Sequence, residues 1–165
     1  MSNSSPYGVQ PDQLTNLAGA IYFAGADATS RHCLWQSDGT TAGTRTVAPS
    51  KGGPRGLSPR FIRPYKGTLL FCGYYADGRR GLWRSDFTES GTNRILVPNE
   101  NLAGVAGLAM EGFAELNNEL FFGGHNAAHD VSLWKTDGTA NGTIEVPFRG
   151  GKNIAPRFMV AASLR

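Results

Sequence analysis

One phrase occurs three times in this chain of 165 residues, and it constrains the fold more than any other feature. Each copy begins with Leu-Trp and a variable residue, continues with Ser or Thr and then Asp, and ends on Gly-Thr. The copies occupy residues 34–44, 82–92 and 133–143. Their tryptophans lie 48 and then 51 residues apart, a spacing typical of one supersecondary unit that is repeated along the chain.

The residues around each phrase predict four short strands per copy. A Phe lies 12 residues before each Trp and marks a second strand, which follows a short alternating run. These first runs cover residues 14–17, 62–65 and 113–116, and the pairs Ala18-Gly19, Lys66-Gly67 and Asn117-Asn118 follow them as hairpin turns. The third strand carries Leu-Trp. A fourth strand is predicted at residues 45–47, 93–97 and 144–146, each close to a proline that suits an edge.

Four short strands without a helical period, repeated about every fifty residues, favour an all-β fold built from β-propeller blades. We expect one repeat domain over residues 1–165, with blades at about 11–58, 59–109 and 110–155, and a fourth unit that begins at 156–165. The alternative is an open β solenoid, which stacks without closing.

Three blades do not close a ring, since propellers have four to eight. We therefore predict a homodimer that closes a six-bladed ring and covers the open sheet edges; the alternative is that the chain is a piece of a longer array. Sedimentation of the purified chain checks this prediction, and a stable monomer at micromolar concentration would contradict it.

The recurring Trp and Asp residues admit two interpretations. The tryptophans Trp35, Trp83 and Trp134 are either sugar-stacking platforms or core residues between sheets, and their place inside a strand favours the core. The aspartates Asp38, Asp86 and Asp137 are either catalytic or calcium-binding carboxylates or turn residues, and the following Gly and Thr favour the turn. Phe87 replaces that Gly in the middle copy, so we expect either a different turn geometry or an exposed contact there.

The phrase resembles the bacterial ELWxxDGT repeat family over Leu14 to Pro147, although Cys33, Gly81 and Ser132 stand where the family has Glu. This resemblance implies a propeller-like structure and no settled activity. The turn is also loosely similar to the Asp-box hairpin of sialidase-like propellers, but no arginine cluster with a Tyr/Glu pair supports glycosidase chemistry.

Composition excludes several classes of function. A net charge of +3 with 18% charged residues lacks the dense basic stripe of a nucleic-acid binder, and no apolar run is long enough to cross a membrane. Residues 1–10 do not form a signal peptide, so a cytoplasmic location is favoured over a secreted one. Cys33 and Cys72 are expected to be buried free thiols. The group His125, His129 and Asp130 matches no standard metal site, so we expect neither a metal nor a cofactor.

The segments that differ between copies are the expected place for a ligand. They join the second strand to the third (26–32, 74–80 and 125–131) and one blade to the next (50–58, 99–109 and 149–155). In a propeller both sets open on one face, which gathers basic residues, among them Lys51 and Arg55. The candidate ligand-binding residues are Tyr74, Tyr75, Arg79, Arg80, Arg31, His32, His125 and His129.

A basic face with tyrosines suits a glycan or another anionic ligand. No nucleophile elbow or Cys/His pairing is present in the sequence. We therefore expect a non-enzymatic binding module, lectin-like or protein-binding. The alternatives are a hydrolase or lyase with loop His and Asp residues at the central channel, and a structural assembly element.

Overall fold

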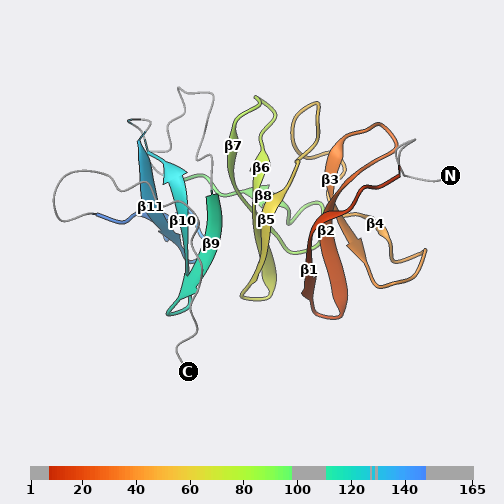
Figure 1. Cartoon of the computed structure of the whole chain (residues 1–165), viewed down its shortest axis with the longest axis horizontal. Helices are drawn as coiled ribbons and strands as arrows, with labels where there is room; N and C mark the ends of the chain where they lie inside the picture. The colour runs from red at the N-terminus through yellow and green to blue at the C-terminus, as the bar shows by residue number, and fades with distance from the viewer. Residues whose placement is uncertain (1–7, 98–110, 127, 129, 148–165) are drawn as a thin grey trace. The chain divides into compact units, whose positions relative to one another are not determined.

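The computed structural model describes residues 8–97, 111–126, 128 and 130–147. All regular structure within these residues is β, so the predicted all-β class is confirmed. Each copy forms one four-stranded antiparallel sheet whose strands lie in sequence order (Figure 1). The first sheet contains β1 (Asp12–Leu17), β2 (Ala20–Ala26), β3 (His32–Ser37) and β4 (Arg45–Thr46). The second contains β5 (Arg60–Tyr65), β6 (Thr68–Tyr74), β7 (Arg80–Ser85) and β8 (Asn93–Arg94). The third contains β9 (Glu111–Leu116), β10 (Glu119–His125), β11 (Val131–Thr136) and β12 (Ile144–Glu145).

The chain divides into two compact units. One comprises Met1–Gly78 and Leu82–Arg94, and the other comprises Arg79–Gly81 and Ile95–Arg165. The first unit holds the first sheet and most of the second, and the third sheet belongs to the second unit. Among the described residues, no helix has the length and apolar character that crossing a membrane requires.

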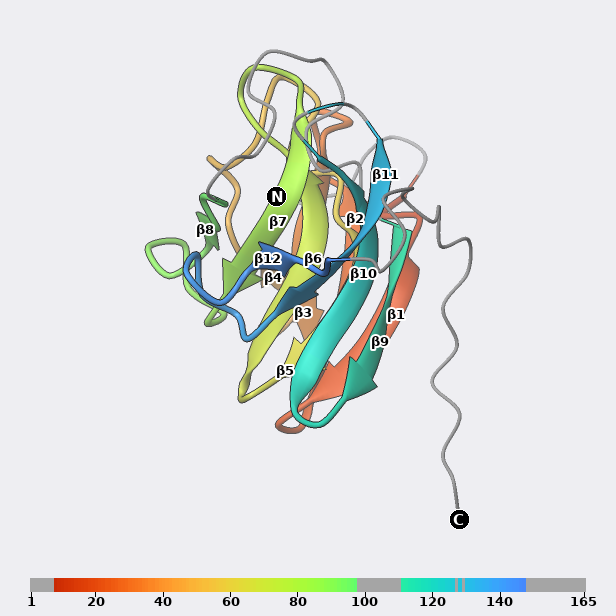
Figure 2. The ribbon, with the colours of Figure 1, turned by 90° about the vertical axis from the view of Figure 1, so that its left-hand side faces the viewer.

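The first two strands of every sheet form a tight hairpin, as the sequence predicts. Both residues of each turn have positive φ, the backbone that lets a two-residue turn match the twist of its strands. The φ values are 51° and 82° at Ala18-Gly19, 46° and 71° at Lys66-Gly67, and 52° and 60° at Asn117-Asn118. Figure 2 shows the third of these hairpins, β9 and β10, side by side.

A bulge near the start of each first strand is not predicted from the sequence. The second residue of each strand has positive φ, at 58° for Gln13, 56° for Phe61 and 63° for Gly112. The register of pairing with the next strand shifts there, as expected of a β-bulge. The Gln13 side chain accepts a hydrogen bond from the backbone N–H of Phe61 at 3.1 Å, which ties the first sheet to the second.

The fourth strands are shorter than predicted. Each pairs over two residues, whereas the sequence favours three to five. In the first and third copies one more hydrogen bond follows, from Val47 N to Leu34 O and from Val146 N to Leu133 O, both at 2.8 Å. Val47 is 2% exposed and packs in the core of the first unit, so its side chain serves the core rather than a longer edge strand.

The core of the first unit lies between its two sheets. Tyr22, Ala24 and Leu34 of the first sheet share it with Leu69, Phe71 and Trp83 of the second. Phe23 and Trp35 belong to a separate cluster with Cys33, against which Val9 packs. The Phe–Trp face of the second sheet is therefore the face that packs on the first sheet.

Each tryptophan is buried against the Phe that precedes it by 12 residues. The ring pairs Phe23–Trp35, Phe71–Trp83 and Phe122–Trp134 are stacked, with centroids 6.2, 6.3 and 6.4 Å apart. The tryptophans are 2%, 6% and 3% exposed, so these indoles lie inside the protein and present no open stacking platform.

Cys33 and Cys72 are both buried free thiols, as predicted. Burial, with the Asp27 carboxylate close by, raises the pKa of Cys33 to about 12. This thiol therefore stays protonated at neutral pH, which makes it a poor nucleophile.

Candidate functional site

The Asp-containing phrase folds into the same turn in all three copies, and we call these segments the Asp turns. They cover Ser37–Thr44, Ser85–Thr92 and Thr136–Thr143. In each, Oδ1 of the Asp accepts hydrogen bonds from the backbone N–H and the hydroxyl of the Thr two residues later. The distances are 2.9 and 2.7 Å for Asp38, 3.0 and 2.6 Å for Asp86, and 2.8 and 2.7 Å for Asp137.

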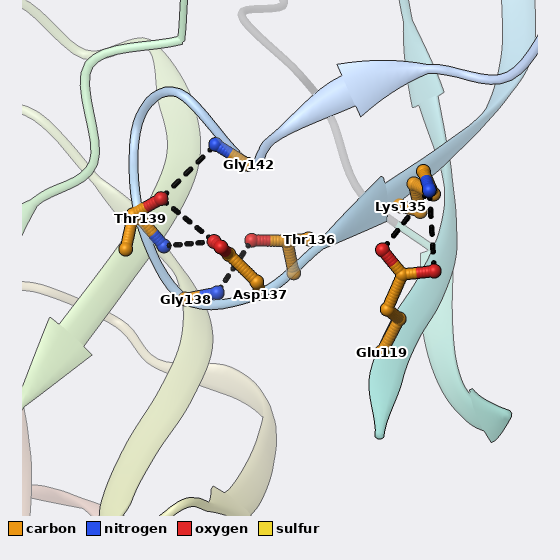
Figure 3. A network of polar contacts seen from close by, with 7 residues as sticks. All are labelled: Glu119, Lys135, Thr136, Asp137, Gly138, Thr139 and Gly142. Carbon is orange, nitrogen blue, oxygen red and sulfur yellow. Dashed lines mark hydrogen bonds and ion pairs between the residues drawn. The ribbon is translucent and has the colours of Figure 1, made fainter. Parts of the chain in front are cut away.

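Hydroxyl groups complete a closed network within each Asp turn, and Figure 3 shows the bonds around Asp137 and Thr139 in the third copy. In the first, Thr44 donates to the Thr40 carbonyl at 2.7 Å, so its oxygen accepts the proton of Ser37, also at 2.7 Å. Ser37 in turn accepts from Gly39 N at 3.1 Å. An ionised Asp is the stronger acceptor for this network. Accordingly, hydrogen bonds from the Thr40 side chain and backbone lower the pKa of Asp38, and those of Thr88 lower the pKa of Asp86.

The Gly near the end of each Asp turn is required by the Asp itself. A Cβ atom on Gly43, Gly91 or Gly142 would overlap the carboxylate of the Asp five residues earlier. The backbone N–H of the same Gly donates to the turn Thr, at 3.0 Å in the first copy. The recurrent aspartates therefore stabilise a turn. The hydrogen bonds of this turn account for nearly every residue that recurs in the phrase.

Both expectations for Phe87 are wrong. Its φ is +74° and Asp86 keeps the common hydrogen bonds, so the turn geometry is unchanged. Nor is the side chain an exposed contact, because it is partly buried and its ring lies 4.7 Å from that of Tyr22 on the neighbouring sheet. Packing between the two sheets holds a bulky residue in a backbone conformation that it rarely adopts.

The loops after the second strands share a side-chain cap in the first and third copies, and the middle copy has a different residue at that position. Asp27 Oδ1 accepts from the backbone N–H groups of Thr29 and Arg31, at 2.8 and 3.0 Å. Asn126 Oδ1 does the same with Ala128 and Asp130, at 3.0 and 3.1 Å. The equivalent residue of the middle copy is an aromatic one, Tyr75. The loop that departs from the common rule is the better candidate for a specific function.

A pocket of about 340 Å³ lies at this middle loop, within the first unit. One wall is the turn Gly53–Gly56 of the segment between the first two sheets, and the other is the loop around Tyr74, Tyr75 and Gly78. A Cβ on Gly53 would lie 3.1 Å from Tyr75 O, so the two walls meet backbone to backbone. The pocket thus joins the two kinds of variable segment that the sequence singles out.

Arg31 holds the wall formed by the connecting segment. Its guanidinium donates to the carbonyl oxygens of Pro49, Lys51 and Gly53, at 2.9, 3.3 and 3.5 Å. Arg31 is a predicted ligand-binding residue, but its hydrogen bonds make it a positioning residue for this wall.

Backbone hydrogen bonds fix the rest of that wall. His32 N donates to Arg55 O at 2.9 Å, and Ser58 N donates to His32 O at 2.8 Å. Tyr74 N donates to Leu57 O at 2.7 Å, which ties the segment to the second sheet. Gly56 has a φ of +80°, and a Cβ there would overlap the His32 carbonyl. The imidazole of His32 remains exposed.

Tyr75 is 4% exposed and is anchored from two sides. Its ring centroid lies 5.9 Å from that of Trp83, and the Arg94 guanidinium carbon lies 3.7 Å above it. A cation over an aromatic face is attracted by the quadrupole of the ring. Tyr75 is thus a rigid part of the pocket, whereas Tyr74 beside it is half-buried.

The remaining candidate residues are not among those that line this pocket. Arg79 and Arg80 are half-buried and belong to the second compact unit. His125 ends β10 and is half-buried, and His129 lies outside the described residues. Within the described part of the chain, no three His, Cys, Asp or Glu side chains form a group that could hold a metal ion.

Sequence reasoning did not single out Pro54, Arg55 or Gly78 as lining residues. Arg55 counts among the basic residues of the predicted face, but nothing in the sequence separates it from the others. The sequence did hold one signal for this site: when the copies are aligned, Tyr75 occupies the position of Asp27 and Asn126.

Comparison with models of known protein families gives no match for this chain. A search of curated proteins also finds no relative.

Proposed function

We propose that this chain is a non-enzymatic binding module that takes a glycan or another anionic ligand in the pocket between the Gly53–Gly56 turn and the Tyr74–Gly78 loop. The observation that carries the proposal is the pocket's place at the one loop where Tyr75 replaces the capping Asx residue. Its walls are held by backbone hydrogen bonds and by Arg31, so it is formed before a ligand arrives.

For the architecture, we propose that the three sheets are blades of a β-propeller. The support is the threefold repetition of one four-stranded antiparallel unit and, in the first unit, the packing of the Phe71–Trp83 face on the preceding sheet. In such a fold the pocket is one of several loop sites on a face, which allows weak sites to add through multivalency.

A glycan array with labelled protein tests the binding function. We expect the parent to bind a subset of glycans, and Tyr74→Ala to lower the signal on that subset about tenfold or more, because the variant removes a lining side chain. Leu14→Ala is the matched control, since Leu14 is 61% exposed on β1 and does not line the pocket. Binding that survives in Tyr74→Ala, or a parent that binds no glycan, would argue against the proposal.

A further inference from the structure

The only charged side chain among the described lining residues of the pocket is that of Arg55. Arg55 is exposed, and its guanidinium has no hydrogen bond or ion pair within the described residues. Two arginines beside the same walls are already engaged, since Arg31 donates to three carbonyls and Arg94 lies over Tyr75. The Arg55 guanidinium is therefore available to bind a ligand.

The size and lining of the pocket fit a single ring. A volume of about 340 Å³ is near the lower end of the range for small-molecule sites. Tyr74 and Pro54 are the lining residues with open ring faces to offer, whereas the glycine peptides bond within the walls, Gly56 N to Gly53 O at 2.8 Å and Gly78 N to Tyr75 O at 3.0 Å. Ring-bearing residues beside a guanidinium match a sugar that has apolar C–H faces and carries an anionic group.

The charge at the site selects the kind of anion. A guanidinium matches a carboxylate in a planar, bidentate pair with one positive and one negative charge. A phosphate monoester carries about −1.5 to −2 at neutral pH and would leave part of its charge unpaired in this pocket.

Resting on the binding function proposed above, we propose that the pocket takes one sugar ring that carries a carboxylate, a uronic-acid type of residue, with Arg55 as its counter-charge.

Titration calorimetry with three probes tests this specificity: methyl glucuronide, methyl glucoside and glucose 6-phosphate. We expect methyl glucuronide to bind most tightly and Arg55→Ala to weaken it about 10- to 100-fold, the range of a hydrogen bond to a charged group. Arg55→Lys should fall between the two, because it keeps the charge but loses the planar fork. Arg45→Ala is the matched control, since Arg45 is an exposed arginine on β4 that does not line the pocket.

Three results would overturn the carboxylate specificity: equal affinity for methyl glucoside, tighter binding of the phosphate, or unchanged glucuronide affinity in Arg55→Ala. The first two, combined with loss of binding in Tyr74→Ala, would leave the binding function standing. Array signals confined to neutral glycans would lead to the same conclusion. A parent that binds neither the probes nor any arrayed glycan would overturn both proposals.

Discussion

Replacing Trp83 with alanine is expected to lower the free energy of unfolding by about 3–5 kcal/mol, the usual effect of deleting a large buried aromatic side chain. Trp83 is 6% exposed, stacks on Phe71 and contacts Tyr75, so the change leaves a cavity in the core between the first two sheets. Since small domains are stable by only about 5–15 kcal/mol, the variant should lose a large share of its stability. Thermal or urea unfolding followed by tryptophan fluorescence measures the loss.

A conservative variant separates packing from hydrogen bonding at this position. Trp83 Nε1 is buried and has no hydrogen-bond partner among the described residues, whereas Trp35 Nε1 donates to Gly25 O at 3.1 Å. Trp83→Phe should therefore cost less than Trp83→Ala, with no hydrogen bond lost. If Trp83→Ala unfolds like the parent but no longer binds its glycan, the indole is a ligand contact and the core assignment is wrong.

Gly91→Ala should destabilise the protein by about 1–3 kcal/mol, the range for overpacking a tight site. The new Cβ would overlap both carboxylate oxygens of Asp86, which would have to leave the turn and give up its two hydrogen bonds to Thr88. The obstacle is the Asp side chain, because the backbone at Gly91 is not in the left-handed region.

A double-mutant cycle with Asp86→Ala makes this prediction specific. Once the carboxylate is gone, the added methyl group has room, so Gly91→Ala should cost little in that background. The expected coupling is about 1–2 kcal/mol, within the range of residues in direct contact. Additive effects in urea unfolding would show that the glycine is needed for some other reason.

Local regularities of the fold were predictable because short segments determine them. The pairs Ala18-Gly19, Lys66-Gly67 and Asn117-Asn118 tolerate positive φ, which places the hairpins and through them the register of each first strand. The constant spacing of 12 residues between Phe and Trp indicates that the two residues pair across neighbouring strands, as Phe23 does with Trp35.

Features that depend on contacts between copies were not predictable. Phe87 keeps a positive φ because Tyr22, 65 residues earlier in the chain, packs against it. The bulge at Gln13 has no glycine to mark it, although Gly112 marks the equivalent bulge in the third copy. The role of Arg31 depends on carbonyl groups 18 to 22 residues away, and an isolated arginine gives no sign of such partners.

The candidate site was predictable in outline only. Tyr74 and Tyr75 line the pocket, and the connecting segment lies beside them, as the comparison of copies indicates. The ligand, the homodimer, the ring and the membership of the ELWxxDGT family stay predictions.

The closed hydrogen bonding of the Asp turns has a consequence for how such a chain can grow and diversify. The recurrent hydrogen bonds of each Asp turn close within eight residues. Such a turn needs no contact with another copy to form, so a duplicated copy would keep it. The middle copy also makes contacts outside its own turn. Its Phe87 packs on Tyr22 and its Glu89 accepts from Ser50 N at 3.0 Å, so it is fitted to the copy before it. The middle copy is thus specific to its position in the chain, and it is the same copy that carries the Tyr75 loop.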